Sequence, residues 1–520
     1  MQISLTQFYE PGLGRRFLRA LAAASLGLAV AFAGTASMAQ AIKDGGTLRA
    51  ALTGEPDLLD PAVSTIYTGA QVYEHIFSKL IDFDGAGNFV PDLATSWEQV
   101  DNNTWKFNLV TNATFHNGEP FTSADVKYSF ERILDPATAS AYAGLYAQIE
   151  SVDASDPAVA VFHLKSPFGP FLNNLATNGQ IVNKTAIESG DPARNPVGTG
   201  PFKFVEWMQG DHITLEKNPT YFKAGLPHLD AVTFRFLLVD QSRIDGLAAG
   251  ELDWVDAIPL TQVPALSKDP RFTYLTSPVA GIPDYIALNT SLPPFDNLKV
   301  RQAVALAIKR ADIRDIAYAG TGELGPIEMP TGSPWYDVAG IFAADQDIEK
   351  AKALLAEAGY PNGLTVEYLG LPQYPELLKT GQVIREHLKA IGIDMTINPV
   401  DVSVWYDAFV NSTYQITSAY QERSIDPDNF YSLVLKTGGP VNTVKYSNPD
   451  IDALIDQAAA SVDMAERKEI YRQIRATVTE DAPLVFTHYE TVNYLMNKNV
   501  VGSGITPTLS LHLENVGFAN

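Results

Sequence analysis

The sequence predicts a mixed α/β protein that is rich in strands in its first part and combines strands with helices in its later part. Three observations lead to this fold class. With 520 residues the chain is too long for a single hydrophobic core, so two or three domains are expected. Apolar and polar residues alternate in short segments of the first half, as in half-buried strands. From Asn297 onward the apolar residues recur at the spacing of helices.

Five segments of the first half are predicted to be strands. Their side chains would point alternately to the two faces of a sheet. These segments are residues 46–52, 105–109, 159–164, 213–216 and 232–236. No long Ser/Gly linker or charge block separates one domain from the next, so we expect the chain to cross between domains through short strands.

The later part begins with a predicted helix over residues 297–317, because Val300 and Val304 fall on one helical face. A second helix is predicted over residues 345–358, with Gly359 as the residue that ends it. A strand, helix and strand come next, and this order implies a parallel pair of strands. They are residues 364–369, 376–391 and 393–399, followed by helices over 449–460 and 464–480 and a strand over 484–487.

The N-terminus has the features of a secretory signal peptide. Arg15, Arg16 and Arg19 precede an apolar run over residues 20–33. A membrane anchor is the alternative, but the run is shorter than the ~20 residues that a spanning helix needs. The pair Arg15-Arg16 raises the question of twin-arginine export, but the residues that follow it match poorly, so Sec export is favoured.

Cleavage is expected after Ala39 or Ala41, where small residues form an A-x-A-like site. Removal of residues 1–39 as the signal peptide would place the mature protein in the periplasm. The chain has no cysteine, so disulfides, thiolate metal sites, a catalytic thiol and a lipid-anchored cysteine are excluded. We therefore expect a free periplasmic protein whose mature chain is not embedded in the membrane.

The charge of the chain is strongly acidic, with a formal value of −23. The signal region contributes a net +2, from its three arginines against Glu10, so the mature chain carries about −25. Such a surface repels phosphate backbones and anionic membranes, which makes nucleic acid an improbable partner. The charge favours solubility and says nothing about the ligand.

Most catalytic and cofactor motifs are excluded. The string Gly320-Thr-Gly-Glu-Leu-Gly325 matches G-x-G-x-x-G, but it follows a predicted helix instead of a strand, so a loop is expected. The eight histidines form no H-E-x-x-H pattern, and neither a G-x-S-x-G elbow nor a Walker loop occurs. We therefore expect no cofactor, no metal and no enzyme activity.

The most informative segment is residues 195–204, Asn-Pro-Val-Gly-Thr-Gly-Pro-Phe-Lys-Phe, which continues to residues 217–222. It closely resembles the signature of the family 5 extracellular solute-binding proteins, and its glycines suit a tight chain reversal. Further blocks resemble the same family in the expected order. They are residues 45–48, 55–61, 91–97, 105–109, 115–126, 250–253, 295–303, 350–359 and 446–454.

The resemblance implies a two-lobed periplasmic binding protein that closes on its ligand like a Venus flytrap. The first lobe would comprise residues 42–283 with 487–520, and an extra subdomain would be inserted near residues 62–190. The second lobe would comprise residues 284–486. The resemblance also implies a hinge of two crossing strands. These strands would lie near residues 285–289 and 485–489.

The implied function is that of the substrate-binding component of an ABC transporter. It would capture a peptide or peptide-like solute, such as an opine, as a monomer and deliver it to an inner-membrane permease with its ATPase subunits. Two other functions are possible on this fold: a secreted hydrolase, or a periplasmic receptor without a transport role. The lack of a nucleophile, base and oxyanion hole in the sequence counts against the hydrolase.

The resemblance also places the ligand-binding loops. In dipeptide-binding relatives, an acidic residue ahead of an Asp-Pro-Asp-like turn holds the ammonium group of the peptide. Here that turn starts at Asp426, and Arg423 stands in the acidic position. A second loop of those relatives has an arginine beside a tyrosine, and this chain has Gln373 beside Tyr374.

A guanidinium in a closing cleft favours a planar anion, which it can hold through two hydrogen bonds. We therefore expect the ligand to carry an anionic group near Arg423. The alternative is that Arg423 pairs with Glu422 or a nearby aspartate and only lines the cleft. Other candidate ligand-binding residues are Tyr67, Thr68, Gly69, Trp405, Tyr406 and Tyr420, although core packing is as plausible for the aromatic ones.

Overall fold

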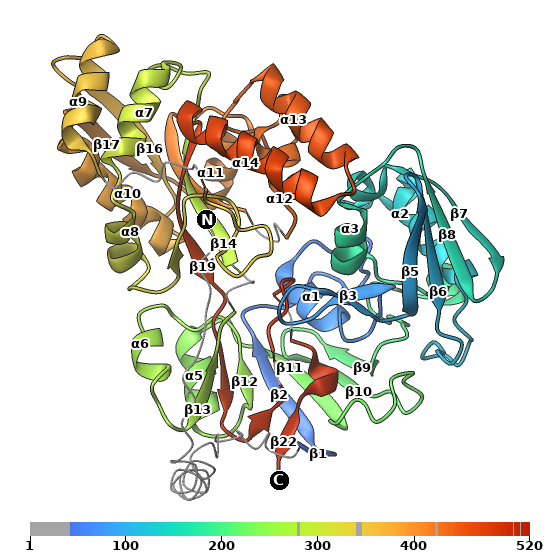
Figure 1. Ribbon diagram of the computed structural model, residues 1–520. Coiled ribbons are helices and arrows are strands. Elements are labelled where there is room, and N and C mark those ends of the chain that lie inside the picture. The colour runs from blue at the N-terminus through green and yellow to red at the C-terminus, as the bar shows by residue number, and fades with distance from the viewer. Residues whose placement is uncertain (1–41, 278–280, 340–345, 422–424, 503, 510) are drawn as a thin grey trace, which may run out of the picture. The chain divides into compact units, whose positions relative to one another are not determined.

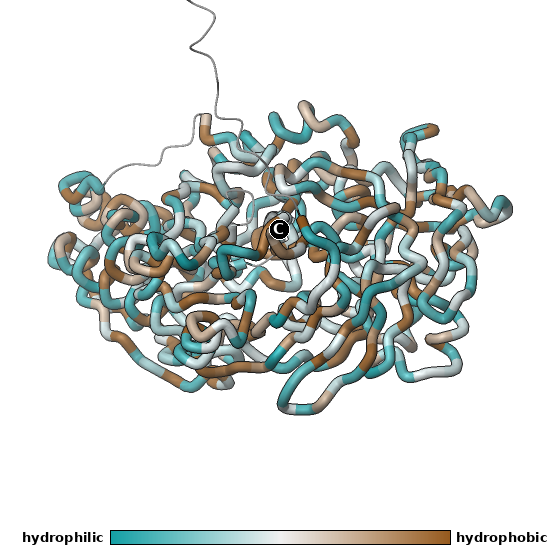
Figure 2. Tube along the Cα trace, turned by 90° about the horizontal axis from the view of Figure 1, so that it is seen from below, coloured by the Kyte–Doolittle hydropathy of each residue, from teal (hydrophilic) through white to brown (hydrophobic). Residues whose placement is uncertain are grey.

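Three large sheets organise the chain, as the mixed α/β class predicts (Figure 1). The computed structural model describes residues 42–277, 281–339, 346–421, 425–502, 504–509 and 511–520. Hydrophobic residues are spread along the whole described chain and do not gather in one block (Figure 2). They form several separate core clusters, each belonging mainly to one sheet and the helices on it.

The first large sheet has seven strands, with β2 near its centre and parallel to both of its neighbours. Leu48, Ala50, Ala51 and Leu52 of β2 are completely buried, as expected for a strand that is covered on both faces. In spatial order the strands are β13 (Phe272–Leu275), β20 (Tyr494–Asn497), β12 (Trp254–Val255), β2 (Thr47–Leu52), β11 (Ala231–Phe236), β10 (His212–Lys217) and β9 (Phe202–Met208).

The second sheet has four antiparallel strands and lies between β2 and β9 in the sequence. Its core is aromatic, with Phe107, Phe130 and Phe162 packed edge to face. The helix α2 starts with a capping box, in which Thr122 and Asp125 satisfy each other's backbone N–H groups. The strands are β5 (Ala94–Asp101), β6 (Thr104–Leu109), β8 (Val159–Leu164) and β7 (Ile149–Asp156), and the helices are α2 (Ser123–Leu134), η1 (Pro136–Thr138), η2 (Ala143–Tyr146), α3 (Phe171–Asn178) and α4 (Lys184–Ser189).

The third sheet has six strands, and the predicted parallel pair is confirmed by β16 and β17, which the helix α10 connects. The strands are β15 (Glu323–Leu324), β19 (Leu484–Thr491), β14 (Gly281–Leu288), β18 (Ile416–Tyr420), β16 (Leu364–Gly370) and β17 (Ile393–Pro399). The helices of this region are α7 (Leu298–Ala307), α8 (Arg310–Ala317), α9 (Ile348–Glu357), α10 (Pro375–Lys389), α11 (Val402–Val410), α12 (Pro427–Phe430), η3 (Tyr431–Leu435), α13 (Pro449–Ala460) and α14 (Met464–Asp481).

Short elements complete the structure. The helices α1 (Tyr67–Tyr73), α5 (Asp240–Ala248), α6 (Val263–Leu266) and η4 (Leu513–Asn515) belong to the first part and the C-terminal tail. A two-stranded sheet joins β3 (Ile81–Phe83) to β4 (Phe89–Pro91), and a three-stranded sheet joins β1 (Ile42–Lys43), β22 (Gly517–Ala519) and β21 (Val500–Val501). In the described part of the chain, no helix is both long and apolar enough to cross a bilayer.

The single helix predicted over residues 297–317 is wrong, because the chain forms α7 and α8 with a break between them. Ile308 and Lys309 have extended backbone angles. Ile308 is 1% exposed, and the Arg310 Nε atom donates a hydrogen bond to the carbonyl of Phe486, 2.7 Å away. Packing against β19 therefore overrides a sequence pattern that would allow one continuous helix.

The strands β14 and β19 are neighbours, with Tyr285 opposite Phe486 in an antiparallel pair (Figure 1). Each connects the six-stranded sheet to the seven-stranded one, because β13 precedes β14 and β20 follows β19. The passages between the two sheets lie between the end of β13 at Leu275 and the start of β14 at Gly281, and between the end of β19 at Thr491 and the start of β20 at Tyr494. They therefore lie outside the predicted hinge segments, 285–289 and 485–489. Movement about these strands, and the division into two lobes, stay predictions.

The chain bends at residues 199–201 of the segment 195–204, but neither Gly198 nor Gly200 has a positive φ, so the backbone conformation does not require glycine there. Instead they permit a close approach to the backbone at Ile76. A Cβ atom on Gly198 would lie 2.1 Å from the carbonyl oxygen of Ile76, and Gly200 donates its N–H to the same oxygen at 2.8 Å. The segment before β9 packs in this way against the residues that follow α1. A larger side chain at either glycine would push these two parts of the chain apart.

Candidate functional site

A cavity of about 210 Å³ lies between segments that are far apart in the sequence. One wall comes from residues 83–173 and the other from residues 330–467, so the four-stranded sheet and the helices over the six-stranded sheet both contribute, and Pro507 of the C-terminal tail also lines the cavity. Its walls are rich in aromatic and apolar side chains. Among them are Phe83, Phe89, Trp105, Leu172, Trp335 and Met464.

A larger hollow of about 440 Å³ lies among α7, α9 and α14. All of its walls come from residues 302–486, that is, from the six-stranded sheet and the helices of its region. A solute-capturing cleft is expected where separately folded parts meet, so the smaller cavity is the better candidate.

Gly169 forms a contact beside the cavity between the four-stranded sheet region and the helices α13 and α14. Its N–H donates to the carbonyl of Ala459 at 2.8 Å, and a Cβ atom there would lie 2.1 Å from the carbonyl oxygen of Ser461. Figure 1 shows α3, which begins two residues later, beside these helices. The absence of a side chain at Gly169 is therefore required for this approach.

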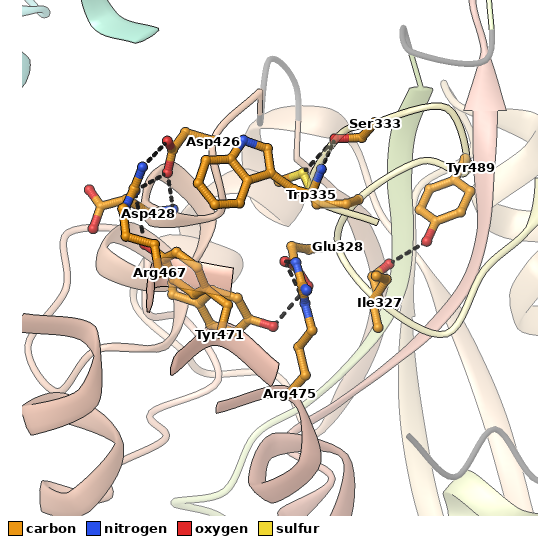
Figure 3. A network of polar contacts seen from close by, with 12 residues as sticks. Ile327, Glu328, Ser333, Trp335, Asp426, Asp428, Arg467, Tyr471, Arg475 and Tyr489 are labelled. Atoms are coloured by element: carbon orange, nitrogen blue, oxygen red, sulfur yellow. Dashed lines mark hydrogen bonds and ion pairs between the residues drawn. The ribbon is translucent and has the colours of Figure 1, made fainter. Parts of the chain in front are cut away.

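The turn at Asp426 lies on the floor of the cavity and is held by a buried ion pair (Figure 3). Arg467 donates from Nη1 and Nη2 to the two carboxylate oxygens of Asp426, at 2.8 and 2.6 Å. Asp426 also accepts the N–H of Asp428 and caps α12. The Arg467 guanidinium lies 4.7 Å from the ring centre of Trp335, which places that indole in the cavity wall.

A second buried ion pair holds the loop that carries Glu328. Arg475 donates to both carboxylate oxygens of Glu328, and the two side chains are 1% and 0% exposed. Tyr431 donates its hydroxyl to Glu328 at 2.8 Å, and Tyr489 of β19 donates to the carbonyl of the preceding residue, Ile327. The loop that leads to Trp335 is therefore attached to both α14 and β19 (Figure 3).

Asp428 makes the stability of the folded protein depend on pH in a direction that its surroundings determine. Burial, and the neighbouring Asp426 carboxylate, raise the pKa of Asp428 to about 6, although Ser432 donates a hydrogen bond to it. The folded protein therefore holds this proton to higher pH than the unfolded chain does. The contribution of Asp428 to stability is full below the unfolded pKa and falls as the pH rises through about 6.

The substitution Asp428→Asn changes the free energy of unfolding, and we expect this change to be more favourable at pH 7.5 than at pH 4 by about 2–3 kcal/mol. The reason is that at pH 7.5 the aspartate carries a buried charge, whereas the amide carries none. Urea unfolding of parent and variant at the two pH values measures this difference. An equal effect of the substitution at both pH values would contradict the prediction.

The structure brings two of the sequence-predicted ligand residues together. The rings of Tyr374, at the start of α10, and Tyr420, at the end of β18, are 6.3 Å apart. Gln373 is exposed beside them. Arg423, to which the anionic-group prediction refers, lies outside the described residues.

The two aromatic candidates on α11 differ in their surroundings. Trp405 is 9% exposed, stacks on Phe409 and donates its indole N–H to Thr417 at 3.1 Å, so it belongs to the core. Tyr406 is 62% exposed on the same helix, α11. A helix places consecutive side chains about 100° apart, so the two cannot share one surface.

The three candidates at the start of α1 have different roles in packing. The Tyr67 hydroxyl lies 2.6 Å from that of Tyr494. Thr68 is buried, and its Oγ1 has no hydrogen-bond partner among the described residues. Gly69 is needed for packing, since a Cβ atom there would lie 2.5 Å from the Ser64 hydroxyl. These three residues are not in the wall of the 210 Å³ cavity.

Two polar groups of the cavity wall were not predicted from the sequence. Asn173 is 5% exposed, and its Nδ2 has no hydrogen-bond partner within the described chain. The indole Nε1 of Trp105 is also buried and has no partner there. The alternating pattern marks Trp105 only as a strand residue, and no local pattern singles out Asn173. Within the described residues, no group of three or more His, Asp or Glu side chains could hold a metal ion.

A family model and related proteins both match this sequence over most of its length. The model of the bacterial extracellular solute-binding proteins, family 5, middle region, matches residues 88–442. The chain is 28% identical to the glutathione-binding protein GsiB of Pectobacterium atrosepticum over 490 residues, which cover 88% of this chain and 91% of that protein.

Solved structures agree with this match. The binding protein AgaA of A. tumefaciens R10, in complex with agropinic acid, is 32% identical, with a TM-score of 0.76 over 91% of this chain and 99% of that one. The ABC transporter substrate-binding protein CtaP of Listeria monocytogenes is 26% identical, with a TM-score of 0.84 over 92% of this chain and 100% of that one. The similarity therefore extends over nearly the whole described fold.

Proposed function

Since the chain belongs to family 5 of the bacterial extracellular solute-binding proteins, we propose that it is the substrate-binding component of an ABC importer. It is exported to the periplasm, where its signal peptide is removed after Ala39 or Ala41. There it captures a peptide-like or opine-like solute as a monomer and delivers it to an inner-membrane permease with ATPase subunits.

One observation carries this proposal: a cavity is enclosed by two parts of the chain that fold on different sheets. Its walls come from residues 83–173 and 330–467 and from Pro507, and the hydrogen bond from Gly169 to Ala459 joins the first two parts beside it. A site between two parts of a fold can exclude water from a bound solute when the parts meet. The buried pair of Asp426 and Arg467 keeps the floor of this site in place.

The ligand carries an anionic group that faces Arg423. Arg423 precedes Ile425 by two positions, and Ile425 lies in the cavity wall. A guanidinium favours a carboxylate or a similar planar anion, and it disfavours the ammonium end of a peptide at the same place. The related protein AgaA is in complex with agropinic acid, and an acidic ligand is in keeping with this class of solute.

The variant Arg423→Ala tests the ligand class. Mass spectrometry of the solute that co-purifies with the parent protein identifies the ligand, and calorimetry with that solute measures its affinity. We expect the affinity of Arg423→Ala to be at least about a hundredfold lower, because a charge-assisted hydrogen-bond pair is lost.

Arg472→Ala is the matched control, since Arg472 is a partly exposed arginine paired with Glu469 on α14. It should leave the affinity unchanged. Equal affinities of Arg423→Ala and the parent would refute the anionic contact. A bound solute without an anionic group would refute the ligand class, and a chemically altered product would point to a hydrolase.

A further inference from the structure

The C-terminal part of the chain forms a loop that reaches the 210 Å³ cavity. Ile505 and Leu511 form an isolated antiparallel bridge, which closes this loop at its base. Between them, Pro507 lines the cavity. We call the described residues of the loop, 505–509 and 511, the tail loop. His512 directly follows the bridge, so a contact that holds His512 also holds the base of the tail loop.

One carboxylate connects His512 to the strand β3. The Nε2 atom of His512 lies 3.4 Å from Oδ2 of Asp82, and the Nζ atom of Lys79 lies 2.8 Å from Oδ1 of the same aspartate. The side chain of Asp82 is 17% exposed and that of His512 is 26% exposed. The contact is therefore partly shielded from water, which strengthens it, while His512 can still exchange its proton with solvent.

The other charged groups around this contact keep their charge near neutral pH. Asp92 accepts the N–H of Lys79 at 2.8 Å and lies 2.8 Å from Nζ of Lys223. Burial lowers the pKa of both lysines, but neighbouring carboxylates outweigh burial and raise both above the usual value. Glu74 and Glu514 add negative charge to the cluster. All these groups line a cavity of about 20 Å³, which has room for about one water molecule and none for a solute.

Two further titratable side chains face the cluster, and both are uncharged near neutral pH. Burial, with the negative charge of Asp92, raises the pKa of Tyr221 well above its usual value. Burial, with the positive charge of His512, lowers the pKa of His75 to about 3. Among the described residues of this cluster, His512 is therefore the one whose charge changes between pH 7 and about 10.

The surroundings of His512 favour its charged form. Burial lowers the pKa of this imidazole, but the hydrogen bond and the negative charge of Asp82, together with Glu514, outweigh burial and raise the pKa to about 9. A histidine of the unfolded chain has a pKa of about 6.5. The contact therefore stabilises the folded protein fully below about pH 6.5, and this stabilisation is lost as the pH rises through about 9.

We propose that His512 is a proton-controlled latch, whose charged contact with Asp82 holds the base of the tail loop and thereby keeps Pro507 in the cavity wall. A second attachment limits the movement, because the carbonyl of Leu509 accepts hydrogen bonds from side chains of α1 and β20. Loss of the proton therefore loosens the tail loop without releasing it. The latch is a property of the fold, and its effect on solute capture rests on the proposed function.

Two measurements on the mature protein, stripped of co-purified solute by mild denaturation and refolding, test the latch. An NMR titration of the histidine ring signals gives the midpoint of His512, whose signal is identified by its loss in His512→Gln. We expect a midpoint of about 9. In hydrogen-exchange mass spectrometry at pH 7.5, the C-terminal peptides of His512→Gln should exchange at least about threefold faster than those of the parent, because the charged contact is missing.

Two further variants separate the charge of His512 from its shape. His512→Lys keeps a positive charge up to about pH 10, so its C-terminal peptides should exchange as slowly as those of the parent at pH 7.5 and stay slow at pH 9.5, after correction for the intrinsic exchange rate. His212→Gln is the matched control. His212 is a histidine of β10 that also pairs with two carboxylates, those of Asp211 and Glu206, and this variant should leave the C-terminal exchange unchanged.

Calorimetry with the identified solute tests the link to the cavity. We expect the deprotonated form of the parent to bind the solute at least about threefold more weakly than the protonated form. Since such coupling is reciprocal, saturating solute should raise the midpoint of His512 by at least about half a pH unit. A purely structural histidine would show no such shift. At pH 7.5, His512→Gln should bind about threefold more weakly than the parent, and His512→Lys as tightly.

Three results would overturn the proposal: a midpoint of His512 below about pH 7.5, equal C-terminal exchange in His512→Gln and the parent, or equal affinities of these two proteins together with an unshifted midpoint in the presence of solute. Circular dichroism verifies that each variant is folded. If no solute binds the parent protein, the proposed function fails, whereas the midpoint and the exchange rates of the solute-free protein still decide whether the latch exists.

Discussion

Replacing Glu328 by Gln is expected to lower the free energy of unfolding by about 3–5 kcal/mol, because it leaves the Arg475 charge buried without its counter-ion. Both side chains are essentially inaccessible to solvent, and Arg475 donates to both oxygens of the carboxylate. Urea unfolding followed by circular dichroism at pH 7 measures the change.

The control is Glu469→Gln, which removes an acidic partner of an arginine on the same helix, α14, but at the surface. Its unfolding midpoint should equal that of the parent. In a double variant, Glu328→Leu with Arg475→Met, much of the lost stability should return, because no unpaired charge stays buried. Unfolding of Glu328→Gln at the parent midpoint would contradict the prediction.

Gly169→Ala is expected to raise the dissociation constant for the co-purified solute by at least about tenfold, with little change in stability. Its Cβ would lie 2.1 Å from the carbonyl oxygen of Ser461 and 2.8 Å from Nε of Arg467, so the two cavity walls could not approach as they do. Several neighbouring atoms would have to move for the hydrogen bond to Ala459 to form. The free energy that this movement costs makes binding of the solute weaker.

Gly144→Ala provides the same substitution in the same region, at an exposed glycine where a Cβ would meet nothing within 4 Å. Calorimetry of both variants with the identified solute should separate them. If Gly169→Ala binds the solute as tightly as the parent and Gly144→Ala do, the contact at Gly169 has no part in capture.

The elements that the sequence predicted best are those whose neighbours in space are also neighbours in the chain. The helix over residues 449–460 and the strand over 393–399 have the predicted bounds, and Gly359 adopts a positive φ just after α9. Local periodicity and capping determine such elements. The break between α7 and α8 was missed, because it depends on packing against β19, about 180 residues away in the sequence.

The candidate site was predictable only in part. The rings of Tyr374 and Tyr420 lie 6.3 Å apart, and their contact with a ligand stays a prediction, whereas Trp405 belongs to the core, where Thr417 accepts its N–H. An aromatic residue near a binding loop has the same appearance in a sequence whether it packs inward or faces a ligand. Burial, which depends on the surrounding elements, makes that distinction.

The sequence alone was sufficient to assign the family and several helices and strands, because motifs such as that at 195–204 and the hydrophobic periodicities are local properties of the chain. It did not reveal the cavity. Asn173 and Trp105 come to line one cavity with Trp335 and Arg467 only when two regions of the fold pack together. The tertiary structure therefore decides what the protein can recognise, since recognition depends on groups brought together from distant positions.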